Sequence, residues 1–411
     1  MRVIWPLLVV FAAALPGPQA SAQAAESAWI VTQDLDAALV LAPGGEAPEG
    51  AVFDRPRERA LYEVSAGLRA ERLLGNGWSL GGRGALRVAK DYPTRPAGTG
   101  NLVPASVQSP AGALSRLSRG PGLAEAGPRG SLESAYLFLE TGYGEFSLGR
   151  DTGVAARFHE GDVSALSSAR LASPFLDPSG LAGVHTRPDV TGPSSKFSYT
   201  SPRLLGVRAG VSLTPRADTR GLDRDATGRA APPRPELDNA VEVAVNVSRR
   251  LRESGVRLRA GLSYARAELD PPGGLEGVYA SAVDQVAAGG EVSWRGGLSL
   301  GANWLWADEG LTGGGDYTAW SAGLAYDLAN WRASFTYGRA EADAAGAETE
   351  ALSLAIARPL TDAATIAVAW QDREVSPMGL AASEAGLPTA NSRGVVVEIT
   401  LAFENCLVSQ C

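Results

Sequence analysis

Hydrophobic and polar residues alternate along residues 62–71, and the alternation resumes after a Gly-Asn-Gly turn at residues 75–77. In the first segment the even positions are apolar, and the odd positions are polar or small: Glu63, Ser65, Gly67, Arg69 and Glu71. In the second segment one face carries Trp78, Leu80, Leu86 and Val88, and the other carries Arg83 and Arg87. A period of two is the signature of a β-strand. The pattern predicts a hairpin with one apolar face and one charged face.

The same alternation recurs along the chain. Residues 241–247 place four valines on one face and Glu242 on the other, and residues 256–264 set Arg257 and Arg259 opposite an apolar face. No segment after the N-terminal apolar run shows helical periodicity. Sixteen strands are predicted, near residues 28–41, 58–73, 77–90, 133–141, 143–150, 195–201, 205–213, 239–250, 255–266, 283–294, 297–307, 316–327, 330–339, 349–358, 362–373 and 392–403.

The connections between these strands alternate in length. From the second strand on, every other connection is a tight turn, and the intervening connections are long: 42–57, 91–132, 151–194, 214–238, 267–282, 308–315, 340–348 and 374–391. Short periplasmic turns and long extracellular loops are typical of outer-membrane barrels. The expected fold class is therefore all-β, a sixteen-stranded antiparallel transmembrane β-barrel.

Aromatic residues at the strand ends agree with this fold, since such barrels carry an aromatic girdle at each membrane interface. Beside the short turns or at the last strand end lie Trp78, Trp294, Tyr326, Trp331 and Phe403. Beside the long loops lie Trp304, Trp306, Trp320, Tyr337 and Trp370. The alternative interpretation is that these side chains form the core of a soluble β-protein.

The N-terminal segment has the features of a targeting sequence. Arg2, an apolar run and the small residues around Gln23 are the parts of a secretory signal peptide, so residues 1–24 are expected to be removed. Residues 25–403 are assigned to the barrel domain and 404–411 to a C-terminal tail. Its cysteines, Cys406 and Cys411, either pair across a short loop or are incidental. The net charge of -8, without a basic block, excludes nucleic-acid binding.

Two segments resemble a known family. The sequence FSLGRDTG at 146–153, followed by a long loop and SKFSYTSPRLLGVRAGVSLTP at 195–215, is similar to the general diffusion porins of Gram-negative outer membranes. The resemblance implies a homotrimer of water-filled channels for small hydrophilic solutes and ions, in contact with outer-membrane lipids and lipopolysaccharide. It also implies that the third loop, here about residues 151–194, folds into the pore. Phe403 matches the terminal aromatic residue that the barrel assembly machinery recognises, and the 91–132 loop matches a latch between subunits.

By this resemblance the third loop supplies the acidic side of a pore constriction, with Glu160, Asp162 and Asp177 as candidates. The basic side is assigned to Arg69, Arg83 and Arg87, and to Arg150 at the family's Gly-Arg position. Arg150 shares the parity of Leu148, so it reaches the lumen only if Gly149 forms a bulge. Opposed charges across a narrow pore make a transverse field, whereas rings of one sign select by charge. The remaining pore-lining candidates are Glu63, Glu71, Glu242, Arg257, Arg259 and Glu398.

Other interpretations stay open at this stage. The loop carboxylates either form the constriction or cap turns, and the arginines either line the pore or only pair with Glu63 and Glu71. An anion-selective or substrate-specific channel, an outer-membrane barrel enzyme and a soluble ligand-binding β-sandwich are the alternatives. Two G-x-S-x-G matches, around Ser79 and Ser299, lie at strand starts without the strand-turn-helix elbow that exposes a nucleophile. No metal site or cofactor is predicted, because the two histidines lack ligand spacing.

Overall fold

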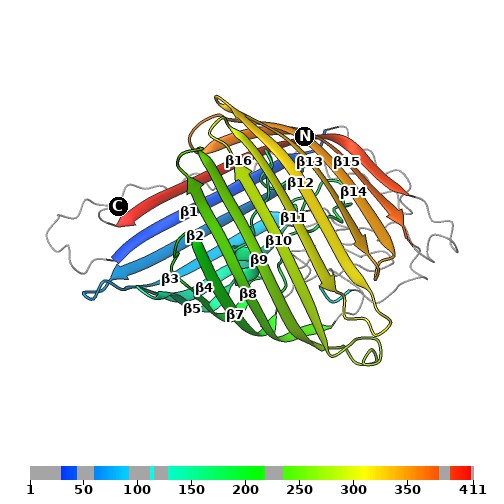
Figure 1. The fold of residues 1–411 in the computed structure, drawn as a ribbon, viewed down its shortest axis with the longest axis horizontal. Coiled ribbons are helices and arrows are strands. Elements are labelled where there is room, and N and C mark those ends of the chain that lie inside the picture. The colour runs from blue at the N-terminus through cyan, green and yellow to red at the C-terminus, as the bar shows by residue number, and fades with distance from the viewer. Residues whose placement is uncertain are drawn as a thin grey trace.

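The computed structural model describes residues 29–43, 60–91, 112–114, 128–217, 235–378 and 389–408. Sixteen antiparallel strands form a closed barrel in which each strand pairs with its neighbours in the chain and β1 pairs with β16 (Figure 1). The strands are β1 Trp29–Leu41, β2 Ala60–Leu73, β3 Ser79–Lys90, β4 Arg129–Thr141, β5 Gly144–Asp151, β6 Ser194–Thr200, β7 Val207–Ala217, β8 Glu236–Leu251, β9 Val256–Asp270, β10 Ala282–Ser293, β11 Leu298–Asp308, β12 Asp316–Leu328, β13 Trp331–Ala342, β14 Ala347–Pro359, β15 Ala364–Pro377 and β16 Ala390–Val408. One short helix, α1, spans Val154–Arg157.

The alternation of the sequence separates the two faces of the barrel wall. Large apolar side chains point outward and are exposed, as in Val241, Val243 and Val245 of β8. Their neighbours Glu242 and Ala244 point inward and are buried. Because the outer face is apolar and the inner face carries small and polar residues, the wall suits lipid outside and water inside. No helix among the described residues is long and apolar enough to cross a membrane.

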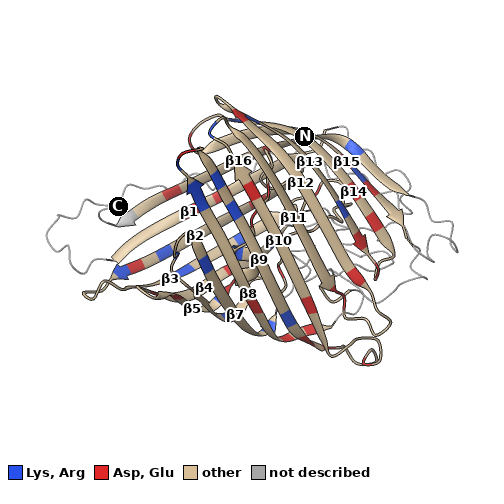
Figure 2. Ribbon diagram, viewed as in Figure 1, with Lys and Arg blue, Asp and Glu red and all other residues tan. Residues whose placement is uncertain are grey.

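The sorting of connections by length holds, with one exception. The link between β13 and β14, predicted as a long loop, is only residues 343–346. We call the end of the barrel with the short connections the turn end and the opposite end the loop end. Charge differs between the two ends, since acidic residues gather near the loop ends of β8–β14 and arginines near the turn ends of β8 and β9 (Figure 2).

The predicted tail is corrected at its start. Strand β16 continues beyond Phe403, and Cys406 and Val408 pair with Thr32 and Val31 of β1. Residues 404–408 therefore belong to the barrel seam. Cys406 is disulfide-bonded, and Cys411 and the predicted signal peptide, residues 1–24, lie outside the described residues.

An apolar cluster fills part of the barrel interior at the loop end. Small lumenal side chains of β8–β16, such as Ala267, Ala307 and Ala342, pack against Leu171 and Leu181 of the segment between β5 and β6. Ala113 and Leu114 join the cluster from the segment between β3 and β4, and the Ala113 N–H donates to the Glu309 carbonyl at 2.9 Å. This part of the predicted latch loop thus lies in its own barrel. The cluster leaves the side of β1–β4 as the open part of the lumen.

Candidate functional site

Residues 152–193, which we call the inner loop, connect β5 to β6 and fold inside the barrel. Both ends of the inner loop are fastened to one carboxylate. Glu242 of β8, which is 1% exposed, accepts a hydrogen bond from the Ala155 N–H at 3.0 Å and another from the Thr191 hydroxyl. Ser212 of β7 accepts the Val154 N–H at 3.0 Å. These bonds hold the start and the end of the inner loop against the same part of the wall.

A groove of glycines receives the next part of the loop. Gly261, Gly289, Gly301 and Gly323 lie on the lumenal face of β9–β12, in contact with the loop backbone. A Cβ atom on Gly289 would lie 2.0 Å from the Glu160 carbonyl oxygen, and one on Gly261 would lie 2.3 Å from that of Phe158. Only glycine permits such an approach of two backbones. The groove sets how far the inner loop extends into the lumen.

The tip of the inner loop is fastened to the far wall. Glu398 of β16 is 2% exposed and accepts three backbone N–H groups, from Ser167 at 2.6 Å, Ser168 at 2.9 Å and Ala169 at 2.7 Å. Arg373 of β15 forms an ion pair with Asp177 at 2.8 Å, and both side chains are essentially unexposed. The inner loop is therefore clamped across the barrel from β8 to β16.

Several predicted pore residues prove to be clamps. Asp177, Glu242 and Glu398 have the predicted lumenal or loop position, but Asp177 is buried within the inner loop, Glu242 and Glu398 are buried beneath it, and none of the three lines the cavity. Glu160 also bonds the wall, through Asn246 at 2.8 Å. A carboxylate that accepts several backbone N–H groups positions a loop, since its oxygens are occupied and removed from water. The predictions that Asp177 forms the constriction and that Glu242 and Glu398 line the pore are therefore wrong.

Arg150 is also corrected. It pairs in register with Ala135 and Ser195, both on the outer face, and its Nε donates to the Leu132 carbonyl at 2.8 Å. Gly149 has a φ of 136° but keeps the register, so no bulge turns the next side chain inward. Arg150 does not face the lumen.

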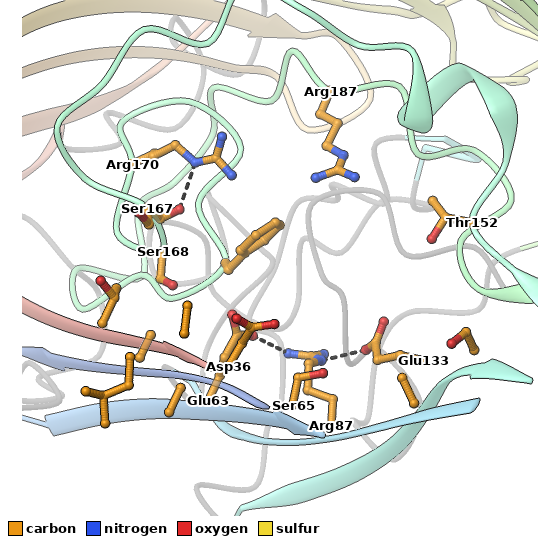
Figure 3. Close-up of a pocket in the computed structure, with 18 of the residues that line it drawn as sticks. Asp36, Glu63, Ser65, Arg87, Glu133, Thr152, Ser167, Ser168, Arg170 and Arg187 are labelled. Atoms are coloured by element: carbon orange, nitrogen blue, oxygen red, sulfur yellow. Dashed lines mark hydrogen bonds and ion pairs between the residues drawn. The ribbon is translucent and has the colours of Figure 1, made fainter. Parts of the chain in front are cut away.

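A cavity of about 780 Å³ lies between the inner loop and the wall formed by β1–β4 and β16. In Figure 3 Arg170 and Arg187 extend into it from the loop, and Asp36, Glu63, Arg87 and Glu133 face them from the strands. Its charged lining residues are Asp36, Glu63, Arg83, Arg87, Glu133, Asp151, Arg157, Asp162, Arg170 and Arg187. The lining thus carries five arginines and five carboxylates, and it has no net charge.

On the wall the arginines are paired. Arg87, which is 3% exposed, lies between Glu63 at 2.9 Å and Glu133 at 2.6 Å. Arg83 pairs with Asp34 of β1 at 3.1 Å. Glu133 reaches the lumen because the register shifts opposite Ala85 and Leu86, which is a β-bulge that inserts one residue into β4. The alternation of inward and outward positions along the sequence could not by itself place the Glu133 side chain in the lumen.

On the loop side, Arg170 pairs with Asp162 at 3.0 Å. The ring of Phe175 lies beside two guanidinium groups. Its centroid is 5.2 Å from the guanidinium carbon of Arg170 and 5.8 Å from the guanidinium carbon of Arg187. Among the described residues Arg187 has no ion pair, and its Nε is buried without an acceptor. Asp36 of β1 likewise forms no ion pair within that part of the chain, although it lines the same cavity.

The sign of the constriction is opposite to the predicted one. The sequence assigned an acidic loop and a basic wall, but the inner loop contributes three arginines against one carboxylate, Asp162. The wall lining, which includes Asp151 of β5, carries four carboxylates against two arginines, and Asp34 adds a fifth. Of the predicted constriction residues, Arg83, Arg87 and Asp162 line the cavity. The charged residues of the constriction that were not predicted from the sequence are Asp34, Asp36, Glu133, Asp151, Arg157, Arg170 and Arg187. Only Asp34 and Asp36 had a signal, since they alternate with apolar residues of β1.

Between the cavity and the turn end, the lumen is basic. Arg69 bonds Glu71 at 2.9 Å and stacks over the Phe138 ring at 4.1 Å. Arg259 pairs with Glu291 at 2.5 Å. Arg257 is exposed and lies directly opposite Arg250 in the β8–β9 pair. Like charges directly opposite each other destabilise a sheet, so this pair lowers the stability of the β8–β9 pairing.

The aromatic girdle residues lie on the outer face. Trp78, Trp294, Trp304, Trp320, Tyr326, Trp331, Trp370 and Phe403 are exposed, and Trp306 and Tyr337 share their face while partly covered. Trp304 pairs directly with Trp320 across two strands, and Trp320 contacts Tyr337 with 5.4 Å between ring centroids. This is where amphipathic rings meet the interfaces of a membrane.

A closed sixteen-stranded barrel with an apolar outer face and an inward-folded loop defines an outer-membrane channel protein. Residues 8–376 match the sequence profile of the Gram-negative porins, and the chain belongs to this family. It lies in the bacterial outer membrane and forms a channel for passive diffusion. No curated protein sequence matches the chain.

Solved structures share the fold at low sequence identity. The anion-selective porin from Comamonas acidovorans is 14% identical, with a TM-score of 0.50 over 92% of this chain and 99% of that one. OprB from Pseudomonas putida is 13% identical, with a TM-score of 0.58 over 91% of this chain and 94% of that one. The trimer form of OmpT from Vibrio cholerae is 12% identical, with a TM-score of 0.50 over 92% and 99%.

Proposed function

We propose that this porin is a general diffusion channel with weak ion selectivity, open to small hydrophilic solutes. The observation that carries the proposal is the balanced lining of the cavity, which contains five arginines and five carboxylates beside a loop that is fixed at both ends. A ring of one sign would favour ions of the opposite sign strongly, whereas balanced opposing charges leave little net preference. The clamps on the inner loop support a passage of fixed width.

An anion-selective channel is the second candidate. It is favoured by Arg250 and Arg257, which are exposed at the turn end without an ion pair among the described residues. The turn end corresponds to the periplasmic side of the barrel. Basic residues at one mouth raise the local concentration of anions. The acidic loop ends of β8–β14 oppose this effect at the other mouth (Figure 2).

We infer a channel without enzymatic activity. Ser79 and Ser299, at the centres of the G-x-S-x-G matches, lie at the starts of β3 and β11. Neither lies at a strand-to-helix turn, which is the geometry that exposes a serine nucleophile. The described residues contain no group of three potential metal ligands.

We further propose a homotrimer in contact with outer-membrane lipids and lipopolysaccharide, inserted by the barrel assembly machinery. The trimer form of the Vibrio cholerae protein supports the oligomer, and the aromatic residues of the outer face support the lipid contact. Phe403 remains the proposed recognition residue of the terminal strand, although β16 extends beyond it. Migration in native electrophoresis before and after heating tests the trimer.

Conductance in planar bilayers tests the function. Stepwise conductance is expected from folded protein, with a reversal potential close to zero in a tenfold gradient of potassium chloride. An ideally selective channel would give about 59 mV. A potential near that limit with the sign for anions would support the second candidate. Folded protein that gives no conductance steps would overturn both.

A further inference from the structure

Exposed arginines gather at the turn end of β8–β10, and we call them the basic rim (Figure 2). The basic rim consists of Arg249, Arg250, Arg252, Arg257 and Arg295. The two turns that join these strands contain a single carboxylate, Glu253, and within the described part of the chain none of the five arginines forms an ion pair. Because like charges repel one another, such a group is stabilised by an anion from outside the chain.

Arg249 lies on the outer face of the barrel. It is exposed, and it pairs in register with Leu258, which pairs in turn with Val292. A charged side chain at the end of an apolar row can extend its stem along the wall and bring its head to the membrane interface. Trp294, a girdle residue at the end of the next hairpin, marks the level of that interface. Arg249 therefore lies where lipid headgroups begin.

A glycine brings the arginines of two hairpins together. Arg295 follows Trp294 and lies over Gly255, in the turn between β8 and β9. A Cβ atom on Gly255 would lie 3.1 Å from the Cβ of Arg295 and 3.2 Å from its Nε. Gly255 has a φ of 67°, a conformation that favours glycine. Arg252 belongs to the same turn, so adjacent hairpins place arginines on one stretch of the rim.

We propose that the basic rim binds anionic phospholipids of the periplasmic leaflet, with Arg249, Arg252 and Arg295 as ligands of the lipid phosphate. The turn end is the periplasmic end of such a barrel. The planar guanidinium group presents paired donors that match the geometry of phosphate oxygens. Arg250 and Arg257 face the lumen and add to the positive potential at the same place. The inference requires only that the barrel lies in its membrane, and it goes beyond the proposed diffusion function.

A phospholipid fits this surface better than a soluble acidic partner does. The outer row of Leu258 and Val292 offers an apolar surface for an acyl chain, and the arginines at its end offer donors for the phosphate. A soluble anion or an acidic protein would use the arginines but not the apolar row. Each basic residue near an anionic lipid surface strengthens binding about fivefold.

Fluorescence quenching in bilayers tests the lipid site. The folded protein is reconstituted in phosphatidylcholine with a small fraction of brominated phosphatidylglycerol or brominated phosphatidylcholine. Trp294→Phe gives the signal of the other tryptophans, so the difference reports the lipid beside Trp294. The association constant of phosphatidylglycerol relative to phosphatidylcholine is expected to be about 25 in wild-type protein. Arg249→Gln and Arg295→Gln should each lower it about fivefold, and together they should bring it close to one.

Two control variants separate charge from packing and from position. Arg249→Lys together with Arg295→Lys keeps both charges and should retain most of the preference, which a purely structural role of the arginines would not predict. Arg339→Gln removes an arginine from the outer face of β13 near the loop end, where Arg339 pairs with Glu341 at 3.0 Å. This variant should leave the relative association constant unchanged.

Three outcomes would overturn the lipid site. A relative association constant of one in folded wild-type protein would refute it, and this is the value expected if the rim instead serves an acidic periplasmic protein. An unchanged constant in the double glutamine variant would show that the two arginines are not the ligands. Loss of the preference on addition of millimolar inorganic phosphate would reveal a site for soluble anions. Conductance steps in pure phosphatidylcholine test the proposed function separately.

Discussion

Glu398 is expected to determine whether the tip of the inner loop stays docked. Its carboxylate accepts the N–H groups of Ser167, Ser168 and Ala169, and a hydrogen bond to a charged group contributes about 1.5–3 kcal/mol. Burial of the carboxylate offsets part of this sum. The net loss in Glu398→Gln is about 3 kcal/mol, because the amide keeps one acceptor and turns a donor toward backbone donors. That loss raises the ratio of released to docked tips by a factor of about 150.

Single-channel recording measures this release directly. Ser167 and Ser168 line the cavity, so movement of the tip changes the width of the passage. Glu398→Gln channels are expected to switch between at least two current levels, whereas wild-type channels remain steady. Glu374→Gln, on the outer face of the neighbouring strand, is the matched control and should behave as wild type. A steady current at the wild-type level in folded Glu398→Gln protein would refute the assigned clamp.

Three further substitutions test the groove, the buried ion-pair cluster and the basic mouth. Gly289→Ala should displace the inner loop and change single-channel conductance, whereas Gly84→Ala, whose Cβ would lie 3.9 Å from its nearest atom, should not. Arg87→Gln leaves two carboxylates without their shared partner and should lower the free energy of unfolding in urea by about 3–5 kcal/mol; an unchanged value would contradict its pairing. Arg250→Glu replaces a repulsive pair with Arg257 by an attractive one and should shift the reversal potential toward cations; a shift toward anions would contradict the basic mouth.

The sequence was sufficient to predict the barrel wall. All sixteen predicted strands are present, and the parity of the β2–β3 hairpin places Arg69, Arg83 and Arg87 on the lumenal face as expected. Alternation succeeds here because each strand has lipid on one side and lumen on the other, so a single period decides both faces. The strands differ mainly at their ends, where β4 begins at Arg129 and β16 ends at Val408.

The constriction could not be predicted in the same way. Glu242 and Glu398 have lumenal parity, but parity does not tell whether a loop covers a side chain. Glu133 enters the lumen through a bulge, which shifts the pattern by one residue. The inner loop has no regular period, so nothing in its sequence distinguished the buried Asp177 from the cavity-lining Arg187. These positions depend on contacts between residues far apart in the chain.

The closing seam between β1 and β16 gives this channel an unusual dependence on its own assembly. Asp36 comes from the first strand, Thr400 lines the same cavity from the last, and Glu398 of that last strand holds the loop tip. The constriction is thus assembled from the first and the last strand of the barrel. A barrel in which β1 has not yet paired with β16 has most of its wall but lacks a complete constriction. The ion selectivity of the channel can therefore report whether β1 and β16 have paired. A measurement of total β-strand content cannot report this.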